Sequence, residues 1–183
     1  MTRRAPAPRA LDERHIGLEA RVAEHDHLSL KLWLRLLACS TQIENDIRRR
    51  LYSAFAVSLA RFDYLAQLHR HPDGLRMKLL TRHLMVTGGS VTGLTDELEG
   101  DGLVQRDDDP LDRRSVRVRL TAKGRKSFER MAREHEVWVE QLFGGLDAKR
   151  KATLYELLGS LRTQMAAASV EDAAVQPRRR AER

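Results

Sequence analysis

Residues 94–124 read LTDELEGDGLVQRDDDPLDRRSVRVRLTAKG, and this stretch decides the fold. Its first part has the pattern of a helix that ends at Gly102, since glycine is favoured just past a helix C-terminus. Two short strands are predicted next, around residues 103–106 and 115–120, because apolar and basic side chains alternate in the second one. The charged residues between the strands, stiffened by Pro110, would form the tip of a hairpin. The stretch therefore predicts a helix followed directly by a β-hairpin.

The residues before this stretch predict a support helix and a tight turn, which complete a helix-turn-helix. Residues 77–85 have the pattern of a short helix whose buried side carries Leu79, Leu80 and Leu84. A turn at residues 85–87 would then lead into the second helix. A short support helix, a tight turn and a helix with an exposed face are the parts that place a recognition helix in the major groove of DNA.

The second helix, predicted over residues 87–101, carries the side chains expected to contact DNA. Thr87 is the expected N-cap. The inward stripe at three- and four-residue spacing consists of Val91, Leu94 and Leu98. The residues left on or near the outer face are small, and several can hydrogen-bond: Ser90, Thr92, Gly93 and Thr95. Small residues let a helix approach base edges closely, and hydroxyl groups can reach bases or phosphates.

A glycine pair, Gly88 and Gly89, stands at the start of this helix. Each glycine lowers helix stability by up to roughly 1 kcal/mol relative to alanine. Close approach of the backbone to a phosphate at the helix N-terminus is a functional reason for the pair. A loose loop before the helix begins is the alternative, and the sequence leaves both open.

The hairpin tip is rich in both aspartate and arginine. A guanidinium at such a tip can enter the narrow, strongly negative minor groove of DNA. The aspartates at 107–109 and 112 would repel phosphates unless they are paired, and the available partners are Arg106, Arg113 and Arg114. The alternative is a merely solvated charged loop, which the preceding helix-turn-helix disfavours.

The rest of the chain has mostly helical patterns, so the predicted fold class is mainly α with a small β-wing. Apolar residues at helical spacing predict helices over 28–51 and 61–69. Thr121 is expected to cap a long helix that a glycine pair ends, and Asp147 to cap a last one. The expected organisation is a disordered basic tail at 1–20, an N-terminal dimerisation helix at 21–58, a winged helix-turn-helix lobe at 59–121, C-terminal dimerisation helices at 122–168 and a disordered basic tail at 169–183.

Composition narrows the classes of partner. The net charge of +7 over 183 residues favours a polyanion, with duplex DNA first. The outer helices carry more apolar surface than a single chain buries, which predicts an obligate homodimer. The single cysteine excludes an intrachain disulfide and indicates a reducing compartment. Because no apolar run is long enough for a secretion signal or a bilayer, we expect a cytoplasmic protein with no membrane partner.

No pattern for catalysis or metal binding is present. The sequence lacks a glycine-rich phosphate loop, a metal-ligand cluster and a nucleophile motif, so no enzyme activity, catalytic residue or cofactor is predicted. The His25-x-His27 and His69-x-His71 pairs are poor metal sites, because two histidines at this spacing on a helix point to different faces.

The motif series closely resembles the MarR family (multiple antibiotic resistance regulators). The resemblance is carried by residues 94–106, by the segment Asp109-Pro110-Leu111-Asp112-Arg113-Arg114 and by residues 120–124, and it extends from about residue 28 to about 165. It implies a triangular homodimer in which the first and the last two helices make the interface. Each wing would flank its recognition helix.

The resemblance also implies roles for the wing residues. In such wings an arginine on the first strand, here Arg106, braces an aspartate, here Asp112. The arginine that enters the minor groove is Arg114, and Arg113 is the next candidate. The departure from the family pattern is the additional acid at Asp107-Asp108, which would weaken contact between wing and phosphate.

Family members usually repress transcription and release DNA when a small molecule or an oxidant acts. The resemblance implies an effector pocket between the dimerisation helices and the DNA-binding lobe. Candidate effector-binding residues are Trp33, Arg35, Cys39, Ile43, Arg48, Phe62 and Tyr64. Similarity to an aromatic-acid-responsive subgroup suggests an aromatic acid or an aryl-CoA thioester, whose phosphates would suit the arginines at 48–50. The alternative is that these residues are ordinary core and interface side chains.

Two other interpretations stay open. Cys39 would make the protein a thiol-based redox-sensing regulator, although its position in mid-helix beside apolar residues favours a buried, inert thiol. A helical protein-interaction module with non-specific nucleic-acid affinity would explain the outer helices, but not a recognition helix and a charged wing in tandem.

Overall fold

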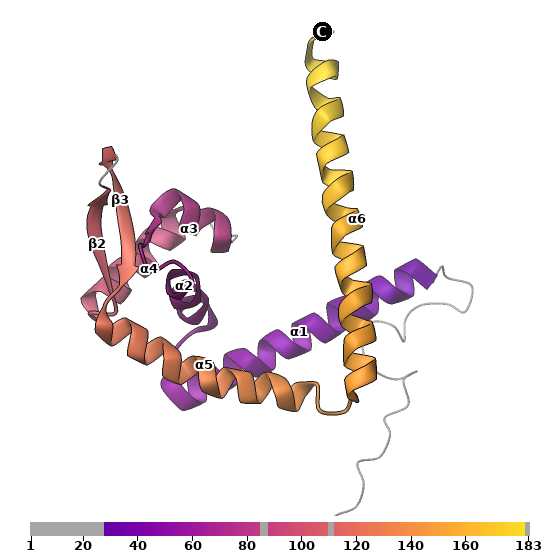
Figure 1. Cartoon of the computed structure of the whole chain (residues 1–183), viewed down its shortest axis with the longest axis horizontal. Helices are drawn as coiled ribbons and strands as arrows, with labels where there is room; N and C mark the ends of the chain where they lie inside the picture. The colour runs from indigo at the N-terminus through magenta and orange to yellow at the C-terminus, as the bar shows by residue number, and fades with distance from the viewer. Residues whose placement is uncertain (1–27, 85–87, 110–111, 182–183) are drawn as a thin grey trace, which may run out of the picture. The chain divides into compact units, whose positions relative to one another are not determined.

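A computed structural model describes residues 28–84, 88–109 and 112–181, with only the backbone described at 88–89, 109, 112–114 and 168–181. The helices and the two wing strands follow the predicted order, and a short strand precedes the third helix (Figure 1). They are α1 (Leu28–Phe55), α2 (Leu59–His69), β1 (Leu75–Arg76), α3 (Met77–Leu84), α4 (Gly88–Gly100), β2 (Val104–Asp109), β3 (Asp112–Leu120), α5 (Ala122–Leu142) and α6 (Ala148–Ala181). The predicted fold class, mainly α with a small β-wing, is confirmed.

The helix ends lie where the local sequence predicts them. Thr121 caps α5 by accepting a hydrogen bond from the Gly124 N–H at 3.0 Å. Asp147 caps α6 by accepting one from the Arg150 N–H at 2.8 Å. Such caps satisfy backbone donors that have no partner within the helix. After α4 the chain turns at Gly102, whose φ of +69° lies in the left-handed region that glycine adopts without strain.

The described strands form an antiparallel sheet in the order β1-β3-β2. The hairpin of β2 and β3 pairs Val104 with Leu120 and continues toward the tip, with an irregularity between Asp108 and Asp109. Strand β1 was not predicted, because a two-residue strand is too short to show an alternating pattern. It pairs with β3 through Leu75 and Val118, so it attaches the start of α3 to the wing.

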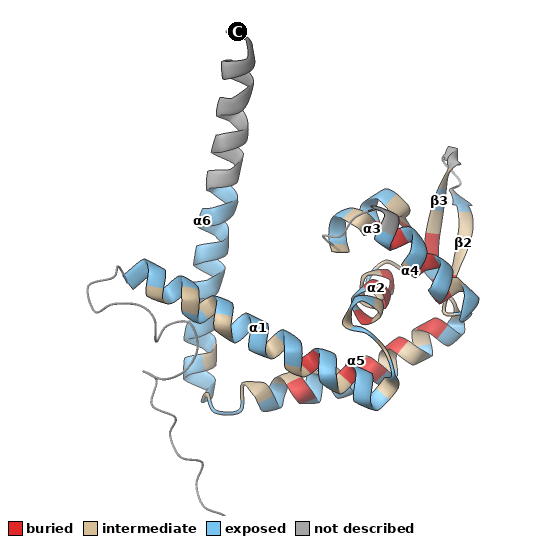
Figure 2. Cartoon of the chain, turned by 180° about the vertical axis from the view of Figure 1, so that it is seen from behind, coloured by how far each residue is buried: buried red, intermediate tan, exposed pale blue. Residues whose placement is uncertain are grey.

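The core lies between α2, α3, α4, the base of the wing and the adjoining parts of α1 and α5, as the buried residues in Figure 2 show. It consists mainly of aliphatic and aromatic side chains: Ile47, Leu51, Phe62, Tyr64, Leu65, Leu68, Leu75, Leu80, Val91, Leu98, Val104, Val118, Leu120, Phe128 and Met131. Fully burying one such side chain contributes about 2 kcal/mol. The core therefore holds α4 and the wing on one framework.

The chain divides into two compact parts inside α5, between His135 and Glu136. In the first part, α1 buries only Ile47 and Leu51 among its residues, and its N-terminal half exposes large apolar side chains. In the second part, α6 exposes a row of large apolar side chains: Leu154, Tyr155, Leu157, Leu158, Leu161 and Met165.

Two expectations about these helices differ from the structure. Leu79 was expected on the buried side of α3 but is exposed. Leu80 is the buried residue of this eight-residue helix. The last helix continues to Ala181, through residues predicted as a tail, since the preceding segment is rich in alanine, the strongest helix former. The predicted N-terminal tail at 1–20 lies outside the described residues. None of the described helices is long and apolar enough to cross a membrane.

Candidate nucleic-acid interface

Helix α4 presents a face of small residues away from the core. Ser90, Thr92 and Gly93 are exposed, as predicted, while Val91 and Leu98 are fully buried on the opposite side. A Cβ added at Gly93 would meet no atom within 4 Å. The exposed face therefore has only short side chains at these positions, which would let the helix approach base edges closely. Thr87 lies outside the described residues, and Gly88 and Gly89 are described only as helical backbone.

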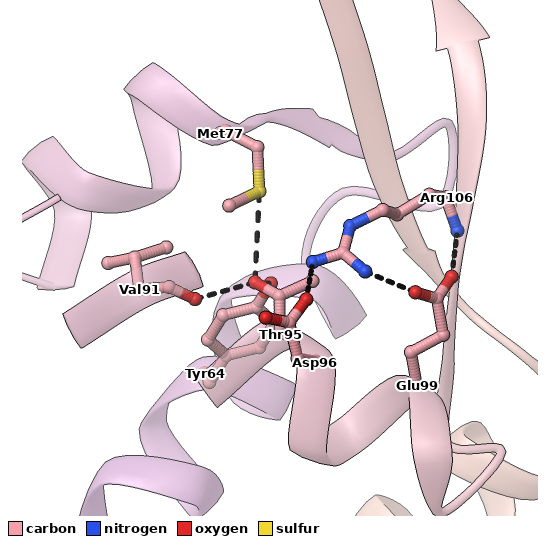
Figure 3. Close-up of polar contacts among 7 residues, drawn as sticks. All are labelled: Tyr64, Met77, Val91, Thr95, Asp96, Glu99 and Arg106. Carbon is pink, nitrogen blue, oxygen red and sulfur yellow. Dashed lines mark hydrogen bonds and ion pairs between the residues drawn. The ribbon is translucent and has the colours of Figure 1, made fainter. Parts of the chain in front are cut away.

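The prediction that Thr95 lies near the outer face is wrong. Thr95 is 0% exposed and lies between α4 and α2 (Figure 3). Its hydroxyl donates to the Val91 carbonyl at 2.6 Å and lies 2.6 Å from the Tyr64 hydroxyl. Because the inward side of α4 is wider than the stripe of aliphatic residues, it includes this threonine, whose polar group is satisfied internally.

Tyr64, a candidate effector ligand, is a core residue that supports α4. It is fully buried, and burial raises the pKa of its phenol, so the hydroxyl stays protonated. Since the Thr95 hydroxyl proton is directed to Val91, the Tyr64 hydroxyl acts as donor in the bond between them. A buried hydrogen bond of this kind contributes about 1 kcal/mol and orients α4 on α2.

The wing places the predicted tip residues at the far end of the hairpin. Asp112, Arg113 and Arg114 begin β3, and their side chains are not among those described. Residues 110–111 of the tip lie outside the described residues. Figure 1 shows β2 and β3 side by side, extending together away from α5.

Arg106 is held by the recognition helix. Its guanidinium donates to a carboxylate oxygen of Asp96 and to one of Glu99, and its backbone N–H donates to the other Glu99 oxygen at 3.1 Å (Figure 3). The hydrogen bond to Asp96 raises the pKa of Arg106. The family resemblance implies that this arginine also braces Asp112, whose side chain is not among those described. The three-residue spacing of Asp96 and Glu99 places both acids on one face of α4, within reach of this arginine.

Asp107 on the wing pairs with an arginine other than the three that the sequence suggests as partners. Asp107 accepts a hydrogen bond from Arg119 on β3 and another from Gln105 at 2.9 Å. The bond from Arg119 holds the pKa of Asp107 below its ordinary value. The antiparallel register explains the pairing, because Gln105 lies opposite Arg119 and Asp107 opposite Arg117, all on one face of the hairpin.

A further ion pair fixes the C-terminal end of α4. Arg61 on α2 donates to the Asp101 carboxylate and also lies 3.9 Å from Glu97. The hydrogen bond from Arg61 lowers the pKa of Asp101. The Lys123 ammonium donates to the Asp101 backbone carbonyl at 2.6 Å. No local pattern could have found the pairing of Arg61 with Asp101, since 40 residues separate them.

The candidate effector residues do not form one site. Trp33, Arg35 and Cys39 are exposed along the N-terminal half of α1, whereas Phe62 is buried against Phe128 and His135 in the lobe. Ile43 is half-buried on α1. The expectation of a buried Cys39 thiol is wrong for the single chain, because burial along α1 is confined to Ile47 and Leu51.

The arginine run at 48–50 lies inside α1 rather than at its end, because the helix continues to Phe55. Its side chains are paired with acids of the preceding turn. Arg48 pairs with Glu44, and Arg49 and Arg50 both pair with Asp46. A phosphate-bearing effector would have to compete with these carboxylates.

A cleft of about 500 Å³ lies between α1, α2 and α4. Its lining is partly apolar and partly acidic and consists of Glu44, Arg48, Ser58, Leu59, Ala60, Asp63, Leu84, Ser90, Gly93, Leu94 and Glu97. Arg48 is the one candidate effector residue among them. Partial desolvation, together with the charge of Glu44, raises the pKa of Asp63. Among the described side chains, no three histidine, cysteine, aspartate or glutamate residues are grouped so as to hold a metal ion.

Comparison with known proteins identifies this arrangement. The family model described as the MarR family matches residues 57–116, from the loop before α2 into β3. YdgJ of Bacillus subtilis (strain 168), an uncharacterised HTH-type transcriptional regulator, is 28% identical over 109 residues, covering 60% of this chain and 66% of that protein. The match thus spans just under two thirds of the length of YdgJ.

Two further comparisons cover more of the chain. The HTH-type transcriptional repressor YetL of Bacillus subtilis (strain 168) is 25% identical over 159 residues, covering 82% of this chain and 95% of that protein. The crystal structure of Sco3205, a MarR family transcriptional regulator from Streptomyces coelicolor, in complex with DNA, superposes with a TM-score of 0.65. It is 23% identical and covers 76% of this chain and 90% of that one, so this likeness concerns the fold. Residues 57–116, which hold the helix-turn-helix and most of the wing, thus match the MarR family model, and the aligned relatives are HTH-type transcriptional regulators.

Proposed function

We propose that this protein is a homodimeric, sequence-specific repressor that binds a pseudo-palindromic duplex operator and leaves it when a small effector binds. The observation that carries the proposal is the exposed face of α4, whose residues Ser90, Thr92 and Gly93 are exposed and precede a wing that contains five arginines. Two similar proteins support the proposal: the structural neighbour Sco3205, which was crystallised with DNA, and the sequence relative YetL, which is a transcriptional repressor.

In the proposed complex, α4 enters the major groove and the wing follows the neighbouring minor groove. The N-terminal turn of α4, which begins with Gly88 and Gly89, would meet phosphates, since backbone N–H groups at a helix start bind anions. Thr87, also expected to contact DNA, lies outside the described residues. Arg114, with Arg113 beside it, would enter the minor groove. Thr95 is buried and therefore does not contact DNA in this proposal.

The homodimer is proposed from apolar surface that the single chain leaves exposed. Leu28, Trp33 and Leu37 on α1 are exposed, as are Tyr155 and Leu157 on α6. Large exposed apolar surfaces mark interaction sites, so a second copy is the proposed cover for each of these helices. A two-fold dimer would place two copies of α4 about one helical turn of DNA apart.

Selection of duplexes from a random pool, repeated at several salt concentrations, tests the proposal. We expect a palindromic site with half-sites roughly 10 base pairs apart, bound by two protomers, as sedimentation of the complex would measure. Enrichment of no sequence, with weak binding that salt abolishes, would mean a merely basic surface and would favour the interaction-module interpretation.

Replacing Arg114 with alanine is expected to weaken operator binding without unfolding the protein. Loss of a guanidinium from the minor groove should cost about 1–3 kcal/mol, roughly tenfold to a hundredfold in affinity. Fluorescence anisotropy with the selected duplex measures the loss. The matched control is Arg133→Ala, which removes the same charge from an exposed position on α5. Equal affinities of the two variants would show that the wing assignment is wrong.

The effector is proposed to bind in the cleft between α1, α2 and α4, where it would touch the same helix that contacts DNA. Three carboxylates line the cleft, against the single guanidinium of Arg48, which already pairs with Glu44. This excess of negative charge would repel the carboxylate of an aromatic acid or the phosphates of an aryl-CoA thioester. It favours an effector that has an apolar part and a neutral or cationic group.

A matched pair of small molecules tests the charge preference. Phenethylamine is expected to release labelled operator at several-fold lower concentration than phenylacetate, and Asp63→Asn is expected to narrow that difference. The readout is anisotropy at constant ionic strength, because salt alone weakens DNA binding. If phenylacetate releases the operator at the lower concentration, the preference for a cationic effector is wrong and an aromatic acid is favoured.

A further inference from the structure

We propose that Arg106 is a positioning residue that fixes the wing against the recognition helix, and that it acts on DNA only through this geometry. The inference rests on the proposed function, since it concerns how the DNA-binding surface is assembled. It extends the bracing role that the family resemblance implies for Arg106 within the wing to a tie between the wing and the recognition helix.

The register of the hairpin turns Arg106 inward. In a β-strand successive side chains alternate between faces, and Arg106 lies opposite Val118, which is fully buried. Val104, two residues earlier on the same face, is 2% exposed. The other face of the hairpin carries Asp107 and Arg119. Arg106 therefore leaves the wing on the side that packs toward α4.

The partners of Arg106 occupy its guanidinium from two sides. Asp96 accepts from one terminal nitrogen and Glu99 from the other, and Glu99 also accepts the Arg106 backbone N–H (Figure 3). Asp96 and Glu99 lie one turn apart on α4, so the planar guanidinium joins one face of the helix to the strand at several points. These hydrogen bonds together restrain both the distance and the orientation of strand β2 relative to α4.

The charge of this cluster argues against a phosphate contact. One guanidinium between two carboxylates carries a net charge of −1, which repels a phosphate rather than attracting it. The side chain of Arg106 is also only 28% exposed. The cluster is better suited to setting where the tip of the wing, with Arg114, stands relative to the exposed face of α4.

A double-mutant cycle in the full-length protein tests this role. The variants are Arg106→Gln, the pair Asp96→Asn with Glu99→Gln, and the triple variant. The first readout is the affinity for the selected operator divided by that for a scrambled duplex, with its salt dependence. Arg106→Gln is expected to lower this ratio about tenfold and to leave the salt slope unchanged. In the background of the other two substitutions it should have almost no further effect, because its partners are already gone.

The second readout needs no DNA. Hydrogen exchange of the β2 and β3 amides is expected to be faster in Arg106→Gln than in the wild type, because the tie to α4 is lost. The matched control is Arg119→Gln, which removes the same charge but breaks an ion pair within the hairpin. It should keep the affinity ratio, and its exchange should increase less than that of Arg106→Gln.

The proposal is overturned if Arg106→Gln weakens binding to both duplexes equally and lowers the salt slope by about one, since that is the signature of a lost phosphate contact. Unchanged hydrogen exchange of the wing would also overturn it. Failure of the proposed function looks different, because the wild-type protein itself would then select no operator.

Discussion

Gly93→Glu is expected to abolish operator binding while leaving the fold intact. Gly93 lies at the centre of the exposed face of α4, and an added side chain there would extend into open space. In the proposed complex the same position faces the major groove, where a carboxylate would stand close to phosphates without a partner. An unpaired charge in such an interface costs roughly 3 kcal/mol or more, about a hundredfold in affinity.

Anisotropy with the selected duplex measures the affinity, and thermal unfolding measures the stability. Glycine destabilises a helix by up to about 1 kcal/mol relative to residues such as alanine or glutamate. Replacing Gly93 should therefore not lower the midpoint temperature of unfolding. Gly93→Ala is the matched control, which adds the Cβ without the charge and should retain most of the affinity. Operator binding by Gly93→Glu at wild-type strength would mean that this face of α4 does not enter the groove.

Gly124→Ala is expected to cause a large loss of stability. Gly124 lies in the first turn of α5, where an added Cβ would overlap the backbone carbonyl oxygen of Leu103 and lie 2.8 Å from its carbonyl carbon. The same glycine donates its backbone N–H to the Thr121 cap. Since the obstacle is backbone rather than a flexible side chain, α5 or the start of the wing must shift, at a cost of about 3 kcal/mol.

Urea denaturation at a fixed protein concentration measures this loss, because the stability of a dimer depends on concentration. Gly100→Ala is the matched control. Gly100 is also helical, but its added Cβ would meet nothing within 4 Å, so the substitution should leave the free energy of unfolding unchanged or raise it. Equal stability of the two variants would show that the close approach of α5 to Leu103 is not rigid.

The local patterns of the chain predicted the order of the helices and of the two wing strands, but not the two-residue β1 or the full length of α6. The glycine after α4, the threonine before α5 and the aspartate before α6 all act as the sequence predicts. The alternation in residues 115–120 predicted β3 with the correct buried side at Val118. These features depend on residues within one or two turns of each other, where backbone geometry dictates the spacing.

The burial of individual side chains was harder to predict than the elements. Periodicity indicates where the inward side of a helix is centred but not how wide it is. Thr95 therefore counted as an outer residue, although the packing of α2 covers it. Cys39 counted as buried because its neighbours are apolar, yet the single chain buries α1 only from Ile47 onward.

The sequence by itself established the helix-turn-helix, the wing and the basic character of the chain, because local propensity and spacing encode them. The tertiary structure was needed for the partners of the charged side chains. Arg106 pairs with acids on α4, Asp107 with Arg119, and Arg61 with Asp101. An arginine has several acids of similar attraction within the chain, and the choice among them depends on how the elements pack, which no local pattern records.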